Sequence, residues 1–193
     1  IDWAYNSVKN KLDEPMSLGY CNAGVVQEVG SKVYDILPGD RVVSNGAHAE
    51  YVSIPKNLVE KIPDNVTNED AAFTVISSIA LQGIRLCNPT YGEKIAVIGL
   101  GLVGLITVQL LKANGCEVIG IDLDKKKCDI AKSYGASIIN PLKEDVIKSV
   151  NNKTNMIGVD GVIIAAATKS NDVISQSANI SRKRGRIILV VVV

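Results

Sequence analysis

The sequence predicts an α/β fold in which a doubly wound parallel sheet of about five strands follows a smaller all-β region. Over the second half of the chain, apolar runs of strand length alternate with segments of helical periodicity, which is typical of a parallel sheet covered on both faces. Between residues 95 and 111 a glycine-rich turn joins one such strand to one such helix. From residue 19 to about residue 62 the pattern is instead one of short strands and turns, such as Pro38-Gly39-Asp40.

The all-β region is expected to contain three strands, over residues 23–29, 41–44 and 49–54. After it the periodicity becomes helical. Thr67 or Asn68 can cap a helix that carries acidic residues in its first turn and continues over residues 71–86.

This helix divides the chain into two predicted domains. The partial β-domain spans residues 1–70 and the dinucleotide-binding domain spans residues 71–193, with residues 71–91 as a bridging helix. In the second domain, the predicted strands are residues 94–98, 117–122, 136–139, 158–166 and 186–192, and the predicted helices are residues 103–114, 125–134, 144–151 and 171–179.

Both ends of the chain look cut, because it opens at Ile1 without a methionine and closes at Val193 inside an apolar run. A complete dinucleotide-binding sheet has six strands, so a last strand is expected beyond Val193. We therefore expect a longer protein with a further C-terminal domain.

Three glycines, Gly99, Gly101 and Gly104, follow the strand at residues 94–98 with the spacing of a dinucleotide cradle. The first glycine permits a tight turn, the second lets the backbone approach a pyrophosphate, and the third lets helix and strand pack closely. The phosphates would lie on the helix N-terminus, which includes Leu102 and Val103. The context of strand, glycines and helix predicts a Rossmann cofactor domain.

An acidic residue ends the next predicted strand. Asp122 lies 21 residues beyond Gly101, close to the distance at which a carboxylate meets the adenosine ribose. A carboxylate there repels a 2′-phosphate and so favours NAD(H) over NADP(H). The alternative, that Asp122 only caps the next helix, fits Asp124 better. Lys127, and Lys125 beside it, either reach the ribose or are solvated helix charges.

Composition excludes several other classes. With 47% hydrophobic and 21% charged residues and a net charge of +1, the chain resembles an ordinary globular protein and shows no preference for a partner. The 17 uncharged residues between Lys94 and Lys112 would span only about 25 Å as a helix, less than a bilayer core of about 30 Å. We expect no membrane segment.

No nucleic-acid site is expected either. The basic cluster formed by Arg182, Lys183, Arg184 and Arg186 is predicted to be a solvated loop, because no aromatic residue lies near it. The four cysteines, Cys21, Cys87, Cys116 and Cys128, form no Cys-x-x-Cys pair, and we expect reduced thiols in a cytoplasmic protein.

Several ordered motifs make the chain similar to the medium-chain dehydrogenase/reductase superfamily, in which a GroES-like β-domain precedes a Rossmann domain. The matching stretches are LGYCNAGVVQEVG at residues 18–30, LPGDRVV at residues 37–43, AHAEYV at residues 47–52, PDNVTNEDAA at residues 63–72, and residues 92–136 throughout. The resemblance implies an oxidoreductase with a nicotinamide cofactor and a small-molecule substrate. The resemblance is also compatible with the formation of a homo-oligomer.

The chain departs from the zinc-type alcohol dehydrogenases of that superfamily. Their Gly-His-Glu motif falls on Gly19-Tyr20-Cys21, and a second ligand position falls on Thr74. Neither a phenol nor a threonine hydroxyl is a credible zinc ligand. The structural zinc lobe is replaced by the short segment at residues 44–46. We therefore predict no metal.

With zinc absent, a side chain or water must polarise the reacting carbonyl or carry its proton. Tyr20 occupies the lost ligand position, although it can also simply fill that space. His48, the only histidine, belongs to a residue type that titrates near neutrality, although packing is its commoner role. Thr74 and Ser78 lie one helical turn apart on a face that the resemblance places beside the nicotinamide, and Ala166 ends the strand expected on the adenine side.

Among zinc-free branches, the chain looks most like the bidomain oxidoreductases fused to a Gfo/Idh/MocA-type sugar-oxidoreductase domain. We therefore predict a zinc-independent NAD(H)-dependent dehydrogenase or reductase acting on a polar alcohol or carbonyl compound, such as a sugar or sugar nucleotide. Two alternatives remain open. The chain can be a nucleotide-binding module without turnover beside another catalytic domain, or an NADPH-dependent enzyme like the quinone and enoyl reductases. The family usually has a glycine near Val191, where this chain has valines from Val190 to Val193.

Overall fold

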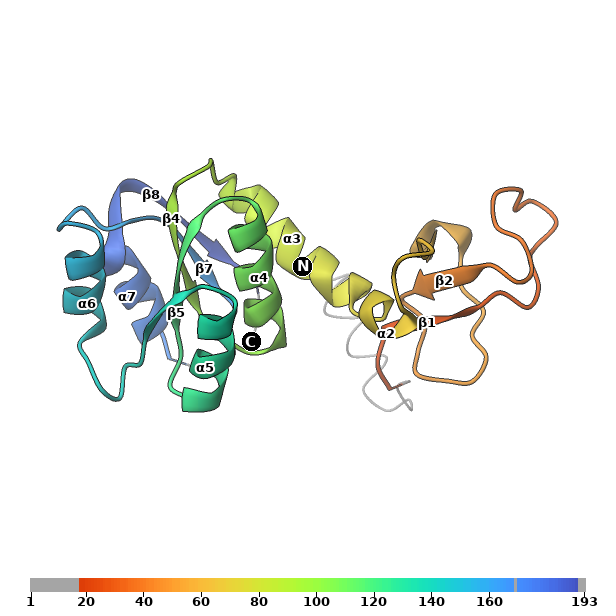
Figure 1. Cartoon of the computed structure of the whole chain (residues 1–193), viewed down its shortest axis with the longest axis horizontal. Helices are drawn as coiled ribbons and strands as arrows, with labels where there is room; N and C mark the ends of the chain where they lie inside the picture. The colour runs from red at the N-terminus through yellow and green to blue at the C-terminus, as the bar shows by residue number, and fades with distance from the viewer. Residues whose placement is uncertain (1–17, 169, 191–193) are drawn as a thin grey trace, which may run out of the picture. The chain divides into compact units, whose positions relative to one another are not determined.

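The computed structural model describes residues 18–168 and 170–190, and the chain divides into two compact units, Ile1–Val75 and Ile76–Val193 (Figure 1). The first unit contains the predicted β-region and the second contains the predicted cofactor domain. The division falls inside helix α3 (Thr74–Cys87).

The first unit holds a three-stranded antiparallel sheet. Its strands are β1 (Asn22–Val25), β2 (Arg41–Ser44) and β3 (Val59–Lys61), in the order β1-β2-β3, with the short 3-10 helix η1 (Lys56–Leu58) before β3. Within the described residues its core is a small cluster of Val43, Ile62 and Ala71, against which Ala23 and Val66 pack. Val43 in β2 lies opposite Ala23 in β1, so both side chains point to the face of the sheet that carries this core.

Of the strand predictions in this unit, one was right only in part and another was wrong. The strand expected over residues 23–29 stops at Val25. Val26 N donates to Asp40 O at 3.0 Å and Gly39 N donates to Val26 O at 2.9 Å, so two residues face Val26 and the regular register ends there. Residues 49–54 form no strand, since no strand of the described residues pairs with them. A β-pattern needs a ladder partner before it becomes a strand.

The helix predicted from Thr67 onward is present but broken. Thr67 accepts a hydrogen bond from Asp70 N at 3.1 Å and caps α2 (Asn68–Ala71). Phe73 N then donates to Asp70 O at 3.2 Å, an i to i−3 bond that tightens the turn and separates α2 from α3.

The second unit is a five-stranded parallel sheet in the order β6-β5-β4-β7-β8, which confirms the predicted doubly wound α/β class. Its strands are β4 (Lys94–Ile98), β5 (Glu117–Ile121), β6 (Ser137–Ile139), β7 (Val159–Ile164) and β8 (Ser181–Leu189), and its further helices are α4 (Leu102–Ala113), α5 (Lys125–Ser133), α6 (Val146–Lys153) and α7 (Asp172–Ile180).

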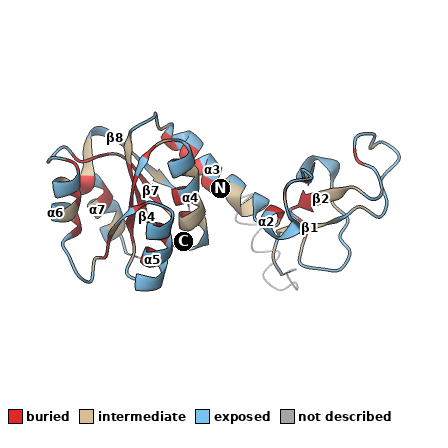
Figure 2. Cartoon of the chain, in the orientation of Figure 1, coloured by how far each residue is buried: buried red, intermediate tan, exposed pale blue. Residues whose placement is uncertain are grey.

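The two faces of this sheet bury two apolar clusters (Figure 2). Along β4, Ile95 and Val97 belong to the cluster shared with α3, α4 and α5, whereas Ala96 and Ile98 belong to the cluster shared with α6 and α7. Successive side chains of a strand point to opposite faces, so one buried strand serves both layers. This explains why the strand reads as a continuous apolar run.

The prediction that the basic cluster forms a solvated loop was wrong in part. Strand β8 begins at Ser181, five residues before the predicted start, and its pairing with β7 is irregular between Val159 and Gly161. Arg182 Nε donates to Asp160 Oδ1 at 2.6 Å, which holds the start of the strand, while Lys183 and Arg184 are exposed.

The predicted end of that strand reaches beyond the described residues. The described residues do not include Val191, where the family usually has a glycine, nor Val192 and Val193. Within the described residues no helix is both long and apolar enough to cross a bilayer.

Candidate cofactor site

The glycine turn between β4 and α4 has the geometry of a phosphate cradle. Gly99 has φ +90°, and a Cβ on it would lie 2.6 Å from the backbone nitrogen of Ala166. A Cβ on Gly104 would overlap the carbonyl oxygen of Gly99. In contrast, no atom lies within 4 Å of where a Cβ of Gly101 would be. Two glycines are therefore required by packing, and Gly101 leaves open space beside the backbone.

The N-terminus of α4 opens onto this turn. Gly101 is the N-cap residue and offers no side-chain hydrogen bond to the first turn, and Leu105 N donates to Gly101 O at 2.8 Å. Leu102 is half exposed, and Val103 is partly buried in the same turn. A helix N-terminus without a side-chain cap favours a negatively charged ligand.

Asp122 follows β5, and backbone amides hold both of its carboxylate oxygens. Oδ2 accepts from Leu100 N at 2.7 Å, inside the glycine turn, and Oδ1 accepts from Asp124 N at 2.8 Å. The carboxylate is therefore fixed beside the cradle while each oxygen retains a lone pair for a further hydrogen bond. Asp124 Oδ1 accepts from Lys126 N at 2.7 Å, so Asp124 caps α5 as the sequence predicts.

The two lysines expected near the ribose differ in their surroundings. Lys125 Nζ lies 2.6 Å from Asp129 Oδ2, and this ion pair raises the pKa of Lys125 and lowers that of Asp129. Lys127 is exposed and makes no ion pair with any residue in the described ranges. Of the two, only Lys127 has an ammonium group free for a ligand.

These residues fit a dinucleotide. The open face at Gly101 accommodates a pyrophosphate, the α4 amides can donate to its oxygens, and Asp122 can accept from ribose hydroxyls. Ala166 lies against Gly99, two residues after the end of β7.

In the first unit, Tyr20 and His48 come from neighbouring segments. His48 N donates to Leu18 O at 2.8 Å, and the His48 ring lies directly against Gly19, where φ is +71° and a Cβ would overlap the imidazole. Tyr20 follows this glycine and is 51% exposed. A glycine is therefore required beside Tyr20 if the ring of His48 is to lie there.

A polar pair that the sequence analysis missed supports the turn before His48. Ser44 is buried and donates through its hydroxyl to Asn22 Oδ1 at 2.6 Å, while Asn22 Nδ2 donates to Ala47 O at 3.2 Å. Gly46 N also donates to Ser44 Oγ at 3.3 Å. The available signal was Asn22 itself, because asparagine is depleted in strands and such a residue often has a hydrogen-bonding role.

Thr74 and Ser78 lie one turn apart on α3 and are both exposed, as the spacing predicts. Burial raises the pKa of the Cys87, Cys116 and Cys128 thiols, so these thiols are not nucleophiles at neutral pH. No group of three or more His, Cys, Asp or Glu side chains able to hold a metal occurs in residues 18–168 or 170–190.

Comparison with known proteins gives two family matches. Residues 1–64 match the alcohol dehydrogenase GroES-like domain, and residues 103–192 match the zinc-binding dehydrogenase domain. An alcohol dehydrogenase of Geobacillus stearothermophilus is 30% identical over 98% of this chain and 63% of its own length. D-Guloside 3-dehydrogenase of Escherichia coli is 34% identical over 76% of this chain and 43% of its own length.

Among solved structures, the mycobacterial protein Rv1454c complexed with NADPH superposes with a TM-score of 0.80 at 30% identity. The match covers 97% of this chain and 60% of that chain. The chain thus spans roughly three fifths of the length of such relatives.

Proposed function

The chain belongs to the medium-chain dehydrogenase/reductase superfamily, and on this premise we propose that the protein is a zinc-independent, NAD(H)-dependent oxidoreductase of a polar alcohol or carbonyl compound. The observation that carries the proposal is the cradle of the second unit. Gly101 leaves space for a pyrophosphate, and the Asp122 carboxylate is anchored to the same turn through Leu100 N.

The preference for NAD(H) rests on charge. A 2′-phosphate brought to the ribose would meet the fixed carboxylate of Asp122, and the ammonium of Lys125 is already paired with Asp129. Of the lysines that follow, neither Lys126 nor Lys127 forms an ion pair among the described residues. NADPH is bound in the Rv1454c structure, so a preference for NADP(H) is the competing outcome that the cofactor test must exclude.

Zinc independence rests on the residues at the ligand positions. Tyr20 and Thr74 stand where the zinc enzymes carry histidine and cysteine or an acid, and neutral hydroxyls are poor zinc ligands. The second matched domain is named after zinc-binding dehydrogenases, so this departure belongs to the chain and not to the family as a whole.

A bound nicotinamide would supply the hydride donor or acceptor. The chain's own contribution would be to orient the cofactor through the α4 amides and Asp122, and to handle the proton of the reacting oxygen. Tyr20 has a hydroxyl that can donate to a carbonyl oxygen, and His48, held against Gly19, can relay the proton to water. Thr74 and Ser78 can hold an amide or a water through their hydroxyls.

The substrate class follows from similarity. The Geobacillus relative is an alcohol dehydrogenase and the E. coli relative acts on a guloside, which supports a polyol or sugar derivative for this protein. We also propose that the protein belongs to the zinc-free bidomain branch and carries a C-terminal Gfo/Idh/MocA-type domain. We propose a cytoplasmic location, and the oligomeric state is left open, with a homo-oligomer as one alternative.

The test is NADH-linked turnover by the full-length protein against a panel of ketoses and sugar derivatives, before and after metal removal with a chelator. The proposal expects the same rate in both preparations. Tyr20→Phe should lower kcat by about 100-fold if the hydroxyl handles the proton, whereas Tyr34→Phe, at an exposed tyrosine of the same unit, should leave it unchanged. Turnover that is lost on chelation and restored by Zn²⁺ would overturn zinc independence. Binding of NADH without turnover would support a non-catalytic module.

A further inference from the structure

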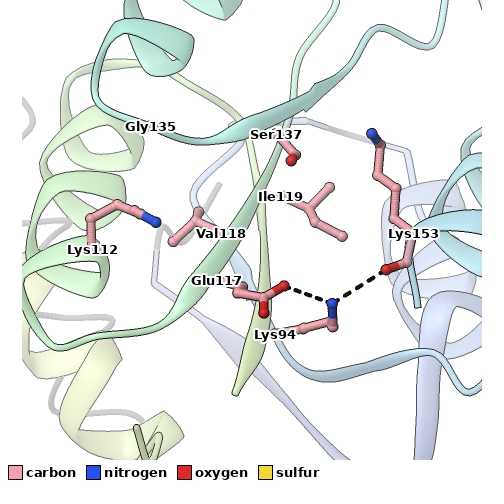
Figure 3. A pocket seen from close by; sticks show the side chains of 8 residues that line it. All are labelled: Lys94, Lys112, Glu117, Val118, Ile119, Gly135, Ser137 and Lys153. Carbon is pink, nitrogen blue, oxygen red and sulfur yellow. Dashed lines mark hydrogen bonds and ion pairs between the residues drawn. The ribbon is translucent and has the colours of Figure 1, made fainter. Parts of the chain in front are cut away.

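A polar pocket lies at the N-terminal ends of the parallel strands, at the opposite end of β4 from the glycine turn (Figure 3). Its lining includes the first residues of three strands, Lys94 of β4, Glu117 of β5 and Ser137 of β6. The glycine cradle instead follows the last residue of β4. A five-residue strand rises about 16 Å, so the pocket is separate from the cofactor site.

Three ammonium groups and one carboxylate line this pocket. Lys112 comes from the last turn of α4 and Lys153 from the end of α6, and Figure 3 shows them on opposite sides of Ile119, with Ser137 between them. Lys94 Nζ lies 2.6 Å from Glu117 Oε2 and donates to Lys153 O at 3.4 Å. The pocket therefore carries an excess of positive charge.

Two of these cations have no ion-pair partner in the part of the chain that the structure describes. Throughout residues 18–168 and 170–190, neither Lys112 nor Lys153 forms an ion pair, and no hydrogen bond engages the hydroxyl of Ser137. Two ammonium groups and a hydroxyl therefore face one concave space without a partner of their own among the described residues, while the Glu117 carboxylate in the same pocket is paired with Lys94. Such a set suits an anion that presents several oxygens.

The alternative role for these lysines is to compensate helix dipoles, because lysine is favoured in the last turn of a helix. The helix carbonyls, however, already have backbone partners. Gly115 N donates to Lys112 O at 3.0 Å, Cys116 N donates to Leu111 O at 3.0 Å, and Met156 N donates to Asn151 O at 2.9 Å. The ammonium groups are therefore not needed as hydrogen-bond donors to the helix ends.

The size of the pocket limits the ligand. Its volume of about 140 Å³ corresponds to roughly five water molecules at ~30 Å³ each, which is far too small for a dinucleotide. Lysine binds phosphate as a point charge and needs no planar geometry. We infer that this pocket binds a small phosphate-bearing anion, either inorganic phosphate or the phosphate group of a small metabolite, held by Lys112, Lys153 and Ser137.

The experiment is calorimetric titration of inorganic phosphate, and in a second arm glycerol 3-phosphate, into the full chain at constant ionic strength. We expect saturable binding with a Kd of about 1 mM or lower. Tighter binding of the ester would assign the pocket to a phosphorylated metabolite, and equal binding would assign it to phosphate itself. No saturable binding of either probe would overturn the inference.

Substitutions separate this role from dipole compensation. Lys112→Gln and Lys153→Gln should each weaken phosphate binding by about 3-fold, and together by about 10-fold. Lys132→Gln is the matched control, because Lys132 also lies in the last turn of a helix, α5, but does not line the pocket. It should leave phosphate binding unchanged while altering thermal stability as the other two do.

Glu117→Gln provides a gain of function. Removing the only carboxylate that lines the pocket should tighten phosphate binding by about 2- to 5-fold, as expected for one exposed charge. Equal effects of all three lysine substitutions on phosphate binding, or weaker binding by Glu117→Gln, would contradict a specific site here.

Discussion

The two units of the chain bury their apolar residues very differently. In the second unit, two clusters flank a five-stranded parallel sheet, and residues such as Ile95, Val97 and Ile163 are fully inaccessible to solvent. Among the described residues of the first unit, the buried cluster holds Val43, Ile62 and Ala71, and Tyr34, Leu37 and Tyr51 are mostly exposed. The difference teaches that packed layers support the glycine turn of the parallel unit, whereas the described part of the β-unit has less apolar packing to support Tyr20 and His48.

The largest effect should come from truncating the two cores. Ile163→Ala should destabilise the protein by about 3–5 kcal/mol, because it leaves a cavity between closely packed layers. Ile62→Ala should cost less, about 2 kcal/mol, because its cluster in the described residues is small and can collapse more easily. Denaturant unfolding followed by circular dichroism measures both. Equal losses would remove the distinction between the units.

The next prediction concerns the two kinds of glycine in the cradle. Gly104→Ala should cost about 1–3 kcal/mol of stability and abolish NADH binding, because the new methyl group overlaps the Gly99 carbonyl. Gly101→Ala should change stability by less than about 1 kcal/mol, since no atom lies within 4 Å, yet should also block the pyrophosphate. Thermal unfolding and NADH fluorescence titration test the pair. Unimpaired NADH binding by Gly101→Ala would show that the phosphates lie elsewhere.

A third prediction uses the ionic tie at the start of β8. Burial raises the pKa of Asp160, but hydrogen bonds from Lys94 N and Arg182 outweigh it and hold that pKa below 3.8. A carboxyl group whose pKa is lowered by folding stabilises the folded protein at pH values above its unfolded-state pKa. This stabilisation is lost as the pH falls through the folded-state pKa. Stability should therefore drop below about pH 4. Asp160→Asn should cost about 1–2 kcal/mol at pH 7 and flatten this drop, as measured by unfolding at several pH values.

The smallest effect is expected in the β-unit. Asn22→Ala removes the acceptor of Ser44 and the donor to Ala47, and should cost about 1 kcal/mol. Because the turn leads to His48, the same substitution should lower kcat more than it changes the KM for NADH. A fall in NADH affinity with kcat intact would contradict this positioning role. Gln27→Ala, at an exposed residue of the same unit, is the control.

The sequence predicted the second unit well because its signals are local. Strand β4 matches residues 94–98 as expected, and the glycine turn and Asp124 cap have the roles that their spacing indicates. The start of β8 was misjudged because a run of basic residues resembles a loop unless Asp160, which pairs with Arg182, is known to lie beside it.

The first unit was predicted less well because strands depend on distant partners. Residues 49–54 alternate like a strand but pair with none in the described part of the chain, and β3 formed at residues 59–61, where no strand was predicted. At the site, spacing alone pointed to Asp122 and Gly101. It could not show that Leu100 N fixes the carboxylate, or that Gly19 and His48 lie in contact.

The most direct test of the account is calorimetric titration of NADH and NADPH into the full-length protein and its Asp122→Ala variant, with Asp124→Ala as a control for the adjoining cap. We predict that the protein binds NADH more tightly than NADPH, and that Asp122→Ala alone moves this preference toward NADPH. Tighter binding of NADPH by the unsubstituted protein, or no binding of either dinucleotide, would contradict the assignment of an NAD(H) site to this turn.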